Sequence, residues 1–187
     1  MRVGGLVLAA GEGRRFGGTK QLAPLRGRPL LSYAVDHMLC VPALDPVIVV
    51  LGHDAAAIRA QVPELDAVTV VVAAHWREGL AASLRAGVNA LGDVTAAVVM
   101  LGDMPFVTPQ VIAGVLDGGP RSAVRATYGG VPGHPVLLPR RLLDRTGELT
   151  GDEGFRTLLS GQHVKVFEAG HLADPTDIDT REELASR

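Results

Sequence analysis

The sequence contains a single cysteine, Cys40, and few aromatic residues. One cysteine excludes an internal disulfide and a cysteine zinc cluster. Aromatic side chains make up only 4% of the 187 residues, whereas the hydrophobic share is 47%, which suits a globular core and argues against disorder. We therefore expect one domain with a core of small aliphatic side chains, in which Cys40 is one of the small buried residues.

Long hydrophobic runs and a strong net charge are also missing. The longest apolar runs, Val47–Leu51 and Ala96–Leu101, are far shorter than the roughly 18 residues of a membrane helix. Glu12, Arg14 and Arg15 follow the first apolar stretch too soon for a signal peptide. The formal net charge of -2 argues against a protein built to coat nucleic acid or an anionic membrane. We expect a cytoplasmic protein with no nucleic-acid or membrane partner.

Apolar runs alternate with segments of helical length in the first half of the chain. The runs are continuous, as in strands that are buried on both faces. Strands are expected at Val3–Ala9, Val47–Leu51, Val68–Val72 and Ala96–Leu101. Helices are expected between them at Pro29–Leu39, Asp54–Val62 and Gly79–Leu91. This order predicts an α/β, three-layer Rossmann-like fold with a mainly parallel, mixed sheet.

The second half of the chain is less regular. Thr108 and Pro109 have the residue types of a helix start. Helices are expected at Gln110–Leu116, Asp152–Leu159 and Thr180–Ala185, and strands at Ser122–Tyr128, Pro135–Leu138 and His163–Phe167. The last two helices would begin with capping boxes, formed by Thr150 with Glu153 and by Thr180 with Glu183.

A glycine-rich loop follows the first expected strand. Residues 6–22 read LVLAAGEGRRFGGTKQL. Glycines let backbone N–H groups approach an anion closely, and the basic side chains in the loop add positive charge. Phosphate is the natural ligand of such a strand-to-helix loop.

Two common phosphate-binding motifs do not fit this loop. A dinucleotide fingerprint needs G-x-G-x-x-G, but Gly11, Gly13 and Gly17 are spaced one residue too far apart, and no acidic residue ends the second strand. A Walker A loop needs Gly-Lys-Ser/Thr, and here Lys20 lies between Thr19 and Gln21.

A third pattern does fit. LAAGEGRRFGGTK resembles the L-A-A-G-x-x-x-R-x-G-x-x-K loop of nucleotidyltransferases that use a nucleoside triphosphate and release pyrophosphate. Gly11, Arg15, Gly17 and Lys20 stand at the matching positions. Asp103 in VVMLGDMP follows an apolar strand, so its carboxylate should lie at the carboxyl end of the sheet, where ligands bind. There it could hold Mg²⁺ beside a triphosphate.

Further segments extend the resemblance over nearly the whole chain. They are AHWREGLAASLRAGV, with Trp76, Gly79, Ser83 and Leu84, then Gly133-His134-Pro135, Gly151–Gly154 and Asp177–Thr180. In this order they resemble the molybdenum cofactor cytidylyltransferase branch of the MobA-like NTP transferase family. Ala73 departs from the asparagine that this branch often carries three residues before its tryptophan, which puts one base or ribose contact in doubt.

The resemblance implies a nucleotidyltransferase fold whose residues 1–105 bind the nucleotide and whose residues 106–187 bind the acceptor. CTP would donate CMP to a phosphorylated acceptor, molybdopterin with or without molybdenum, with Mg²⁺ as cofactor and pyrophosphate as product. A molybdoenzyme would be the partner that receives the product. Ala10 stands where the guanylyl branch usually has glycine, which favours a pyrimidine.

The resemblance also assigns roles to individual residues. The catalytic residues would be Arg15, Lys20 and Asp103. The nucleotide would be bound by Leu8, Ala9, Ala10, Gly11, Gly13, Arg15, Lys20, Gly79 and Ser83. The acceptor would be bound by Gly133, His134, Pro135 and Asp152. The metal ligands would be Asp103, Asp177 and Asp179, with helix capping as the alternative for the last two. Trp76 is expected to serve packing.

Three other functions stay open at this point. A related nucleotidyltransferase could use GTP, or an isoprenoid or sugar phosphate as acceptor. A nicotinamide-dependent oxidoreductase is suggested by the glycines after the first strand, although their spacing argues against it. A non-catalytic nucleotide-binding subunit could hand a cofactor to a target enzyme.

Overall fold

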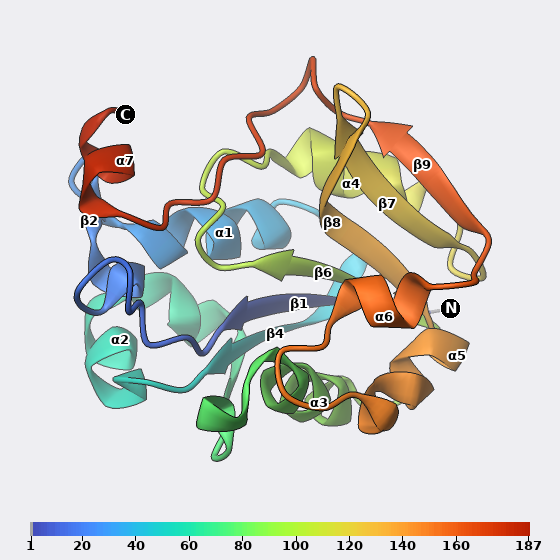
Figure 1. Ribbon diagram of the computed structural model, residues 1–187, viewed down its shortest axis with the longest axis horizontal. Coiled ribbons are helices and arrows are strands. Elements are labelled where there is room, and N and C mark those ends of the chain that lie inside the picture. Colours follow the sequence, from blue (N-terminus) through green and yellow to red (C-terminus); the bar gives the residue numbers. More distant parts are fainter. Residues whose placement is uncertain (1) are drawn as a thin grey trace.

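A seven-stranded mixed sheet runs through the computed structural model, which describes residues 2–187 (Figure 1). Its strands, in spatial order, are β5 (Thr69–Val72), β4 (Leu44–Leu51), β1 (Val3–Ala9), β6 (Ala96–Leu101), β8 (Val131–Pro139), β7 (Ala123–Tyr128) and β9 (Val164–Glu168). The four strands from β5 to β6 are parallel, and β8 is antiparallel to both of its neighbours. A separate two-stranded sheet pairs β2 (Pro24–Leu25) with β3 (Arg28–Pro29).

Helices cover both faces of the large sheet and produce the three predicted layers (Figure 1). The α-helices are α1 (Leu30–Leu39), α2 (Ala55–Gln61), α3 (Leu80–Leu91), α4 (Pro109–Leu116), α5 (Arg140–Leu143), α6 (Phe155–Leu159) and α7 (Arg181–Ala185). Short 3-10 helices are η1 (Lys20–Leu22), η2 (Pro63–Ala67), η3 (Trp76–Glu78) and η4 (Asp144–Glu148). Within residues 2–187, every helix is too short or too polar to cross a membrane.

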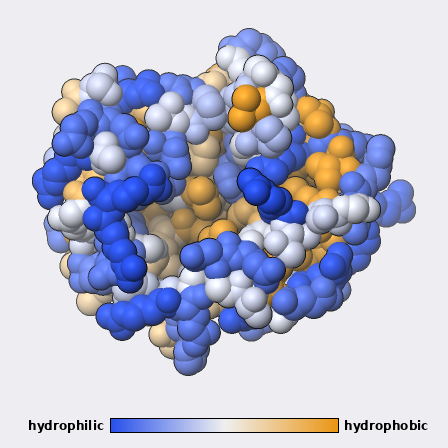
Figure 2. Space-filling model, viewed as in Figure 1, coloured by the Kyte–Doolittle hydropathy of each residue, from blue (hydrophilic) through white to orange (hydrophobic). Residues whose placement is uncertain are grey.

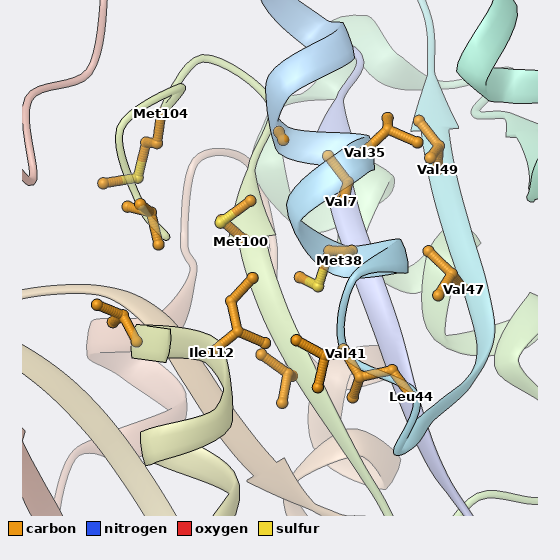
Figure 3. Packing of buried hydrophobic residues seen from close by; sticks show 14 of the residues in the cluster. Val7, Val35, Met38, Val41, Leu44, Val47, Val49, Met100, Met104 and Ile112 are labelled. Atoms are coloured by element: carbon orange, nitrogen blue, oxygen red, sulfur yellow. The ribbon is translucent and has the colours of Figure 1, made fainter. Parts of the chain in front are cut away.

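The core lies in two apolar layers, one on each face of the sheet. Figure 3 shows the layer in which Met38 of α1 lies among Val7 of β1, Met100 of β6 and Ile112 of α4. The opposite layer packs α3, α5 and α6 against the sheet. Each large aliphatic side chain that is fully buried contributes about 1.5–3 kcal/mol, so these layers hold the sheet in place beneath the loops that follow it.

The crossover connections place the loops after β1 and β6 side by side. From β1 the chain moves through α1 to β4 on one side, and α3 later returns it to β6 on the other side. Leu8 of β1 pairs with Leu101 of β6 near the carboxyl ends of both strands. An open α/β sheet binds its ligands at such a change of direction.

The hairpin between β7 and β8 is held by one carboxylate of β9. Glu168 accepts hydrogen bonds from Thr127 Oγ1 at 2.8 Å, Gly129 N at 2.8 Å and Gly130 N at 3.1 Å. These hydrogen bonds, led by that of Thr127, lower the pKa of Glu168 to about 2. The hairpin is thereby fixed relative to the edge of the sheet.

The structure confirms the expected elements of the first half almost residue by residue. Three other predictions are wrong. β5, expected to be buried on both faces, is partly exposed, with Val72 at 52%, because it is the edge strand of the sheet. Thr150 and Glu153 close a turn instead of starting a helix, since Glu153 Oε2 accepts from both Thr150 N and Oγ1, and α6 begins only at Phe155. Cys40 is exposed, because it lies off the α1 face that buries Leu31, Val35 and Met38. The capping box of Thr180 and Glu183 is confirmed.

Candidate active site

The glycine-rich loop after β1 folds back on itself. Gly17 N donates to Gly13 O at 2.9 Å. Gly13 has a φ of +67°, and a Cβ at this position would lie 2.4 Å from Gly18 O, so only glycine fits there. Gln21 is buried and donates from Nε2 to Ala9 O at 2.8 Å and to Gly11 O at 2.9 Å. This one amide therefore fixes the backbone that leads into the loop.

A cavity of about 520 Å³ opens beside this loop at the carboxyl ends of β1 and β6. Figure 2 shows a hollow in this region with an apolar floor and hydrophilic side chains around it. The cavity is lined by Leu8, Ala10, Gly11, Glu12, Gly13, Arg14, Arg15, Trp76, Arg77, Gly79, Leu80, Ser83, Leu101, Asp103 and Asp152. A smaller cavity of about 100 Å³ adjoins it and is lined in part by Ala9, Lys20, Gln21 and Asp103.

One wall of the large cavity is built around Trp76. The Arg77 guanidinium lies 4.5 Å from the centroid of the Trp76 ring, and the His53 ring lies 5.4 Å from it. Gly79 has a φ of +106° and leaves no room for a Cβ, which would lie 2.4 Å from Gly151 O. Trp76 thus packs on its neighbours, as expected, and also lines the cavity.

The charged centre of the site joins residues from both ends of the chain. Lys20 Nζ lies 2.6 Å from Asp103 Oδ2 and 2.8 Å from Asp179 Oδ1. Arg15 Nη2 lies 2.5 Å from Asp179 Oδ2. Burial alone would lower the pKa of Lys20, but the charges and hydrogen bonds of Asp103 and Asp179 outweigh burial and raise that pKa. The ammonium is therefore charged at every physiological pH.

A buried isoleucine brings the C-terminal acidic residues to the loop. The Ile178 side chain has no exposed surface and packs with Phe16, Leu25 and Leu30. Its backbone N donates to Asp103 O at 3.0 Å. Partial burial and the negative charges of Asp179 and Asp103 raise the pKa of Asp177. The three predicted metal ligands thus lie in one region, although Asp103 is far from Asp177 and Asp179 in the chain.

The chemistry of these side chains suits a hard divalent cation. Carboxylate oxygens are the preferred ligands of Mg²⁺ and Mn²⁺, and Asp103 Oδ1 is buried without a hydrogen-bond partner. Within residues 2–187, however, no three His, Cys, Asp or Glu side chains form a ready metal-binding cluster. The Lys20 ammonium instead contacts one oxygen of Asp103 and one oxygen of Asp179.

The predicted acceptor residues divide into two places. Asp152 lines the large cavity, and its Oδ1 faces Leu80 N at 3.4 Å. Gly133, His134 and Pro135 lie in β8, outside the linings of the two cavities. The His134 ring packs edge-on against Phe155 with 4.9 Å between the centroids. Burial, followed by the charge of Arg125, lowers the pKa of His134 to about 4, so this imidazole is neutral near pH 7.

The predicted nucleotide-binding residues lie together in the structure, and so do two residues that were not predicted from the sequence. The cavities gather Leu8, Ala9, Ala10, Gly11, Gly13, Arg15, Lys20, Gly79, Ser83 and Asp103. Gln21 and Arg77 were not predicted. Gln21 follows Lys20 directly, but nothing in the sequence marks it as buried. Arg77 could have been predicted, because it follows Trp76 directly in the sequence.

The chain is similar to a known domain family and to characterised proteins. Residues 5–166 match the model of the MobA-like NTP transferase domain. Nicotine blue oxidoreductase of Paenarthrobacter nicotinovorans is 30% identical, over 97% of this chain and 94% of its own length. The molybdenum cofactor cytidylyltransferase of Escherichia coli (strain K12) is 24% identical, over 96% of this chain and 92% of its own length.

Solved structures are similar over the full chain. The crystal structure of Rv0371c from Mycobacterium tuberculosis H37Rv has a TM-score of 0.89 and 34% identity, and the similarity covers 100% of this chain and 96% of that one. Its complex with manganese has a TM-score of 0.85 and 29% identity, with 100% and 97% of the two chains covered.

Proposed function

We propose, since this chain belongs to the MobA-like NTP transferase family, that it transfers CMP from CTP to a phosphorylated acceptor and releases pyrophosphate. Molybdopterin, with or without molybdenum, is the favoured acceptor, by analogy with the E. coli cytidylyltransferase. The observation that carries the proposal is the centre formed by Lys20, Asp103 and Asp179 beside a glycine loop and a 520 Å³ cavity.

The proposal divides the chain between two substrates. Residues 1–105 supply the glycine loop, the Trp76 wall and Asp103, and they hold the nucleotide. Residues 106–187 supply β7, β8 and α6, and they hold the acceptor. Asp152 and Asp179 come from this second part but reach the nucleotide side, so both substrates meet near Asp103.

The base and ribose fit the part of the cavity next to Ala10. The backbone of Leu8–Gly11 lines it, and the buried Ser83 contributes a hydroxyl from α3. The extra methyl group of Ala10 relative to glycine favours the smaller pyrimidine, although one methyl group is worth only about 1–3 kcal/mol of discrimination.

In the transfer step, one bond to the α-phosphorus forms and another breaks. An acceptor phosphate oxygen attacks the α-phosphorus, the bond from that phosphorus to the bridging oxygen breaks, and pyrophosphate leaves with the electron pair. Arg15 and Lys20 stabilise the charge that builds up on the phosphate oxygens. Both cations must first exchange Asp179 for phosphate oxygens. An ionised acceptor phosphate needs no general base, which agrees with the position of His134, packed against Phe155 outside both cavity linings.

A divalent cation is part of the proposal, with Mg²⁺ as the expected ion. Support comes from the carboxylate oxygens of Asp103, Asp177 and Asp179 and from the manganese complex of Rv0371c. When bound, the cation would supply positive charge to the phosphate oxygens. We also propose that the protein acts in the cytoplasm and that it delivers its product to a molybdoenzyme.

A second candidate is an NAD(P)H-dependent oxidoreductase, because the oxidoreductase of P. nicotinovorans matches nearly the whole chain. The local geometry favours it less. A dinucleotide fold uses an acidic residue after its second strand to bind the ribose. Asp54, the first acidic residue after β4, instead accepts a hydrogen bond from the Thr19 hydroxyl and lies outside both cavity linings.

The two candidates differ in what the protein consumes. Pyrophosphate release from CTP with molybdopterin and Mg²⁺ should be compared with oxidation of NADH and NADPH by a quinone. We expect CTP turnover that falls at least about 100-fold in Lys20→Met and Asp103→Asn, the usual cost of a lost transition-state contact. NADH oxidation that both variants retain, without pyrophosphate release by the wild type, would overturn the proposal.

A further inference from the structure

Arg125 and Arg156, on the acceptor side, have no acidic partner among the described residues. Arg125 lies in β7 and Arg156 in α6. Within residues 2–187, neither guanidinium forms an ion pair. The other arginines without an ion pair are all exposed, namely Arg26, Arg59, Arg77, Arg121, Arg141 and Arg181. Arg125, by contrast, is half-buried, where an uncompensated charge is costly.

The sheet register places Arg125 on the same face as α6. Arg125 pairs with Val136 of β8, which in turn pairs with Val99 of β6. Residues in one such row point to one face of the sheet, and Val99 and Val136 pack in the layer that contains α3 and α6. The Arg125 side chain therefore lies on the face that carries the large cavity.

A hydrogen bond directs the guanidinium of Arg125 toward the carboxyl end of β6. Its Nε donates to Gly133 O at 3.1 Å. Gly133 precedes Val136 in a strand antiparallel to β6, so it lies nearer the end of β6 at which Asp103 follows. Nε is used in this bond, and the two terminal nitrogens of Arg125 have no acceptor among the described residues.

Arg156 is an exposed residue of α6. It follows Phe155, whose ring contacts His134. Burial and the charge of Arg156 both lower the pKa of Arg125, as expected of two nearby cations. Figure 2 shows strongly hydrophilic side chains on the border of the hollow toward α6 and β8.

We propose that Arg125 and Arg156 form an anion-binding subsite that holds a phosphate monoester of the acceptor; this inference rests on the proposed function. Guanidinium groups bind phosphate through two parallel hydrogen bonds each. A phosphate dianion would supply the negative charge that is missing beside the two arginines. His134, neutral at the same place, leaves the net charge of the subsite to the arginines alone.

The location separates this subsite from the nucleotide. The linings of the two nucleotide cavities include Arg14, Arg15, Lys20 and Arg77, but neither Arg125 nor Arg156. A triphosphate therefore has its own cations near the glycine loop. Arg125 and Arg156 would instead serve a second anion on the same face of the sheet.

The test uses Arg125→Gln, Arg156→Gln and the control Arg59→Gln. Arg59 is exposed on α2 and likewise forms no ion pair within residues 2–187. Phenyl phosphate serves as the probe, titrated by ³¹P NMR into the full chain saturated with CTP and Mg²⁺. Calorimetry measures CTP binding separately, and melting temperatures confirm that each variant is folded.

We expect the Kd for phenyl phosphate to rise at least about tenfold in Arg125→Gln and Arg156→Gln, the cost of losing a charge-assisted pair of hydrogen bonds. Arg125→Lys should give a smaller rise, since it keeps the charge without the planar fork. The Kd for CTP should change less than twofold in all variants.

Three outcomes would overturn the subsite. They are no binding of phenyl phosphate by the wild type, an unchanged Kd for phenyl phosphate in both arginine variants, and a loss of CTP affinity as large as the loss of phenyl phosphate affinity. Failure of CTP to bind to wild type would instead overturn the proposed function, so the two failures can be told apart.

Discussion

Lys20 Nζ lies 2.6 Å from Asp103 Oδ2, although the two residues are 83 positions apart in the chain. Lys20 reaches this point at the end of the glycine loop, and Asp103 reaches it just past the end of β6. Asp179 approaches the same ammonium from the C-terminal segment at 2.8 Å. These side chains therefore form ion pairs with one another, and under the proposed function substrate phosphates and a cation would replace them.

Replacing Asp179 tests this exchange. Asp179→Asn removes the carboxylate charge that faces both Arg15 and Lys20. Without metal, CTP should bind severalfold more tightly, because its phosphates no longer compete with a carboxylate for two cations. With Mg²⁺, turnover should fall at least about tenfold, because one expected metal ligand has lost its charge. Calorimetry and pyrophosphate release measure the two effects.

Asp174→Asn is the matched control for Asp179→Asn. Asp174 forms its ion pair with Arg187, 2.6 Å away, in the same C-terminal segment. This variant should leave both CTP affinity and turnover close to those of the wild type. If Asp179→Asn behaves like Asp174→Asn, the carboxylate of Asp179 has no part in substrate binding.

Metal removal should affect ligand binding and not the fold. The two apolar layers stabilise the sheet, so EDTA should leave the melting temperature of the free protein unchanged. The further rise in melting temperature on adding CTP should be largely lost in EDTA and restored by Mg²⁺ or Mn²⁺. A CTP-induced rise that EDTA leaves intact would exclude a metal-assisted mode of nucleotide binding.

The tight turn of the glycine loop can be tested by adding one methyl group. At Gly13 a Cβ would lie 2.4 Å from a backbone oxygen, whereas at Gly129 no atom lies within 4 Å. Both glycines have a positive φ, +67° and +58°, so both variants carry the roughly 1 kcal/mol cost of that backbone conformation. Gly13→Ala should weaken CTP binding at least about tenfold, and Gly129→Ala should not. Equal CTP affinities would show that the turn is not needed.

Sequence patterns predicted the first half of the fold because its strands are continuous apolar runs. Val3–Ala9 and Ala96–Leu101 were placed with the bounds that the structure shows. The second half was harder. β8 begins at Val131 and contains Pro132 and Pro135, residues that lower strand propensity and that edge or irregular pairing can tolerate.

The candidate site was predictable where chemistry follows a fixed spacing, as in the loop that ends at Lys20. The site was not predictable where it depends on residues from different segments that meet only in the folded chain. The burial of Gln21 and the lack of acidic partners at Arg125 and Arg156 depend on which segments meet in the fold. The spacing of residues within one segment does not indicate which other segments will contact them.

The neutral imidazole of His134 gives a pH dependence of stability. Its pKa is about 4 in the folded chain and 6.5 in its ordinary state, so between these values the unfolded chain binds more protons. Stability should therefore be lost as the pH falls from 6.5 toward 4. Urea denaturation at pH 7 and pH 5 should show a loss roughly 1–2 kcal/mol larger in wild type than in His134→Gln. Equal losses would mean that His134 is protonated normally.

The most direct measurement is the melting temperature with Mg²⁺ and, in parallel, CTP, GTP, UTP, ATP, NADH and NADPH. A ligand at 100 times its Kd adds about 2.7 kcal/mol to the stability. We predict a clear rise with CTP that Lys20→Met and Asp103→Asn abolish. A rise with GTP alone would keep the chemistry and change the donor. A rise with NADH or NADPH and none with any triphosphate would contradict nucleotidyl transfer at the Lys20–Asp103 centre.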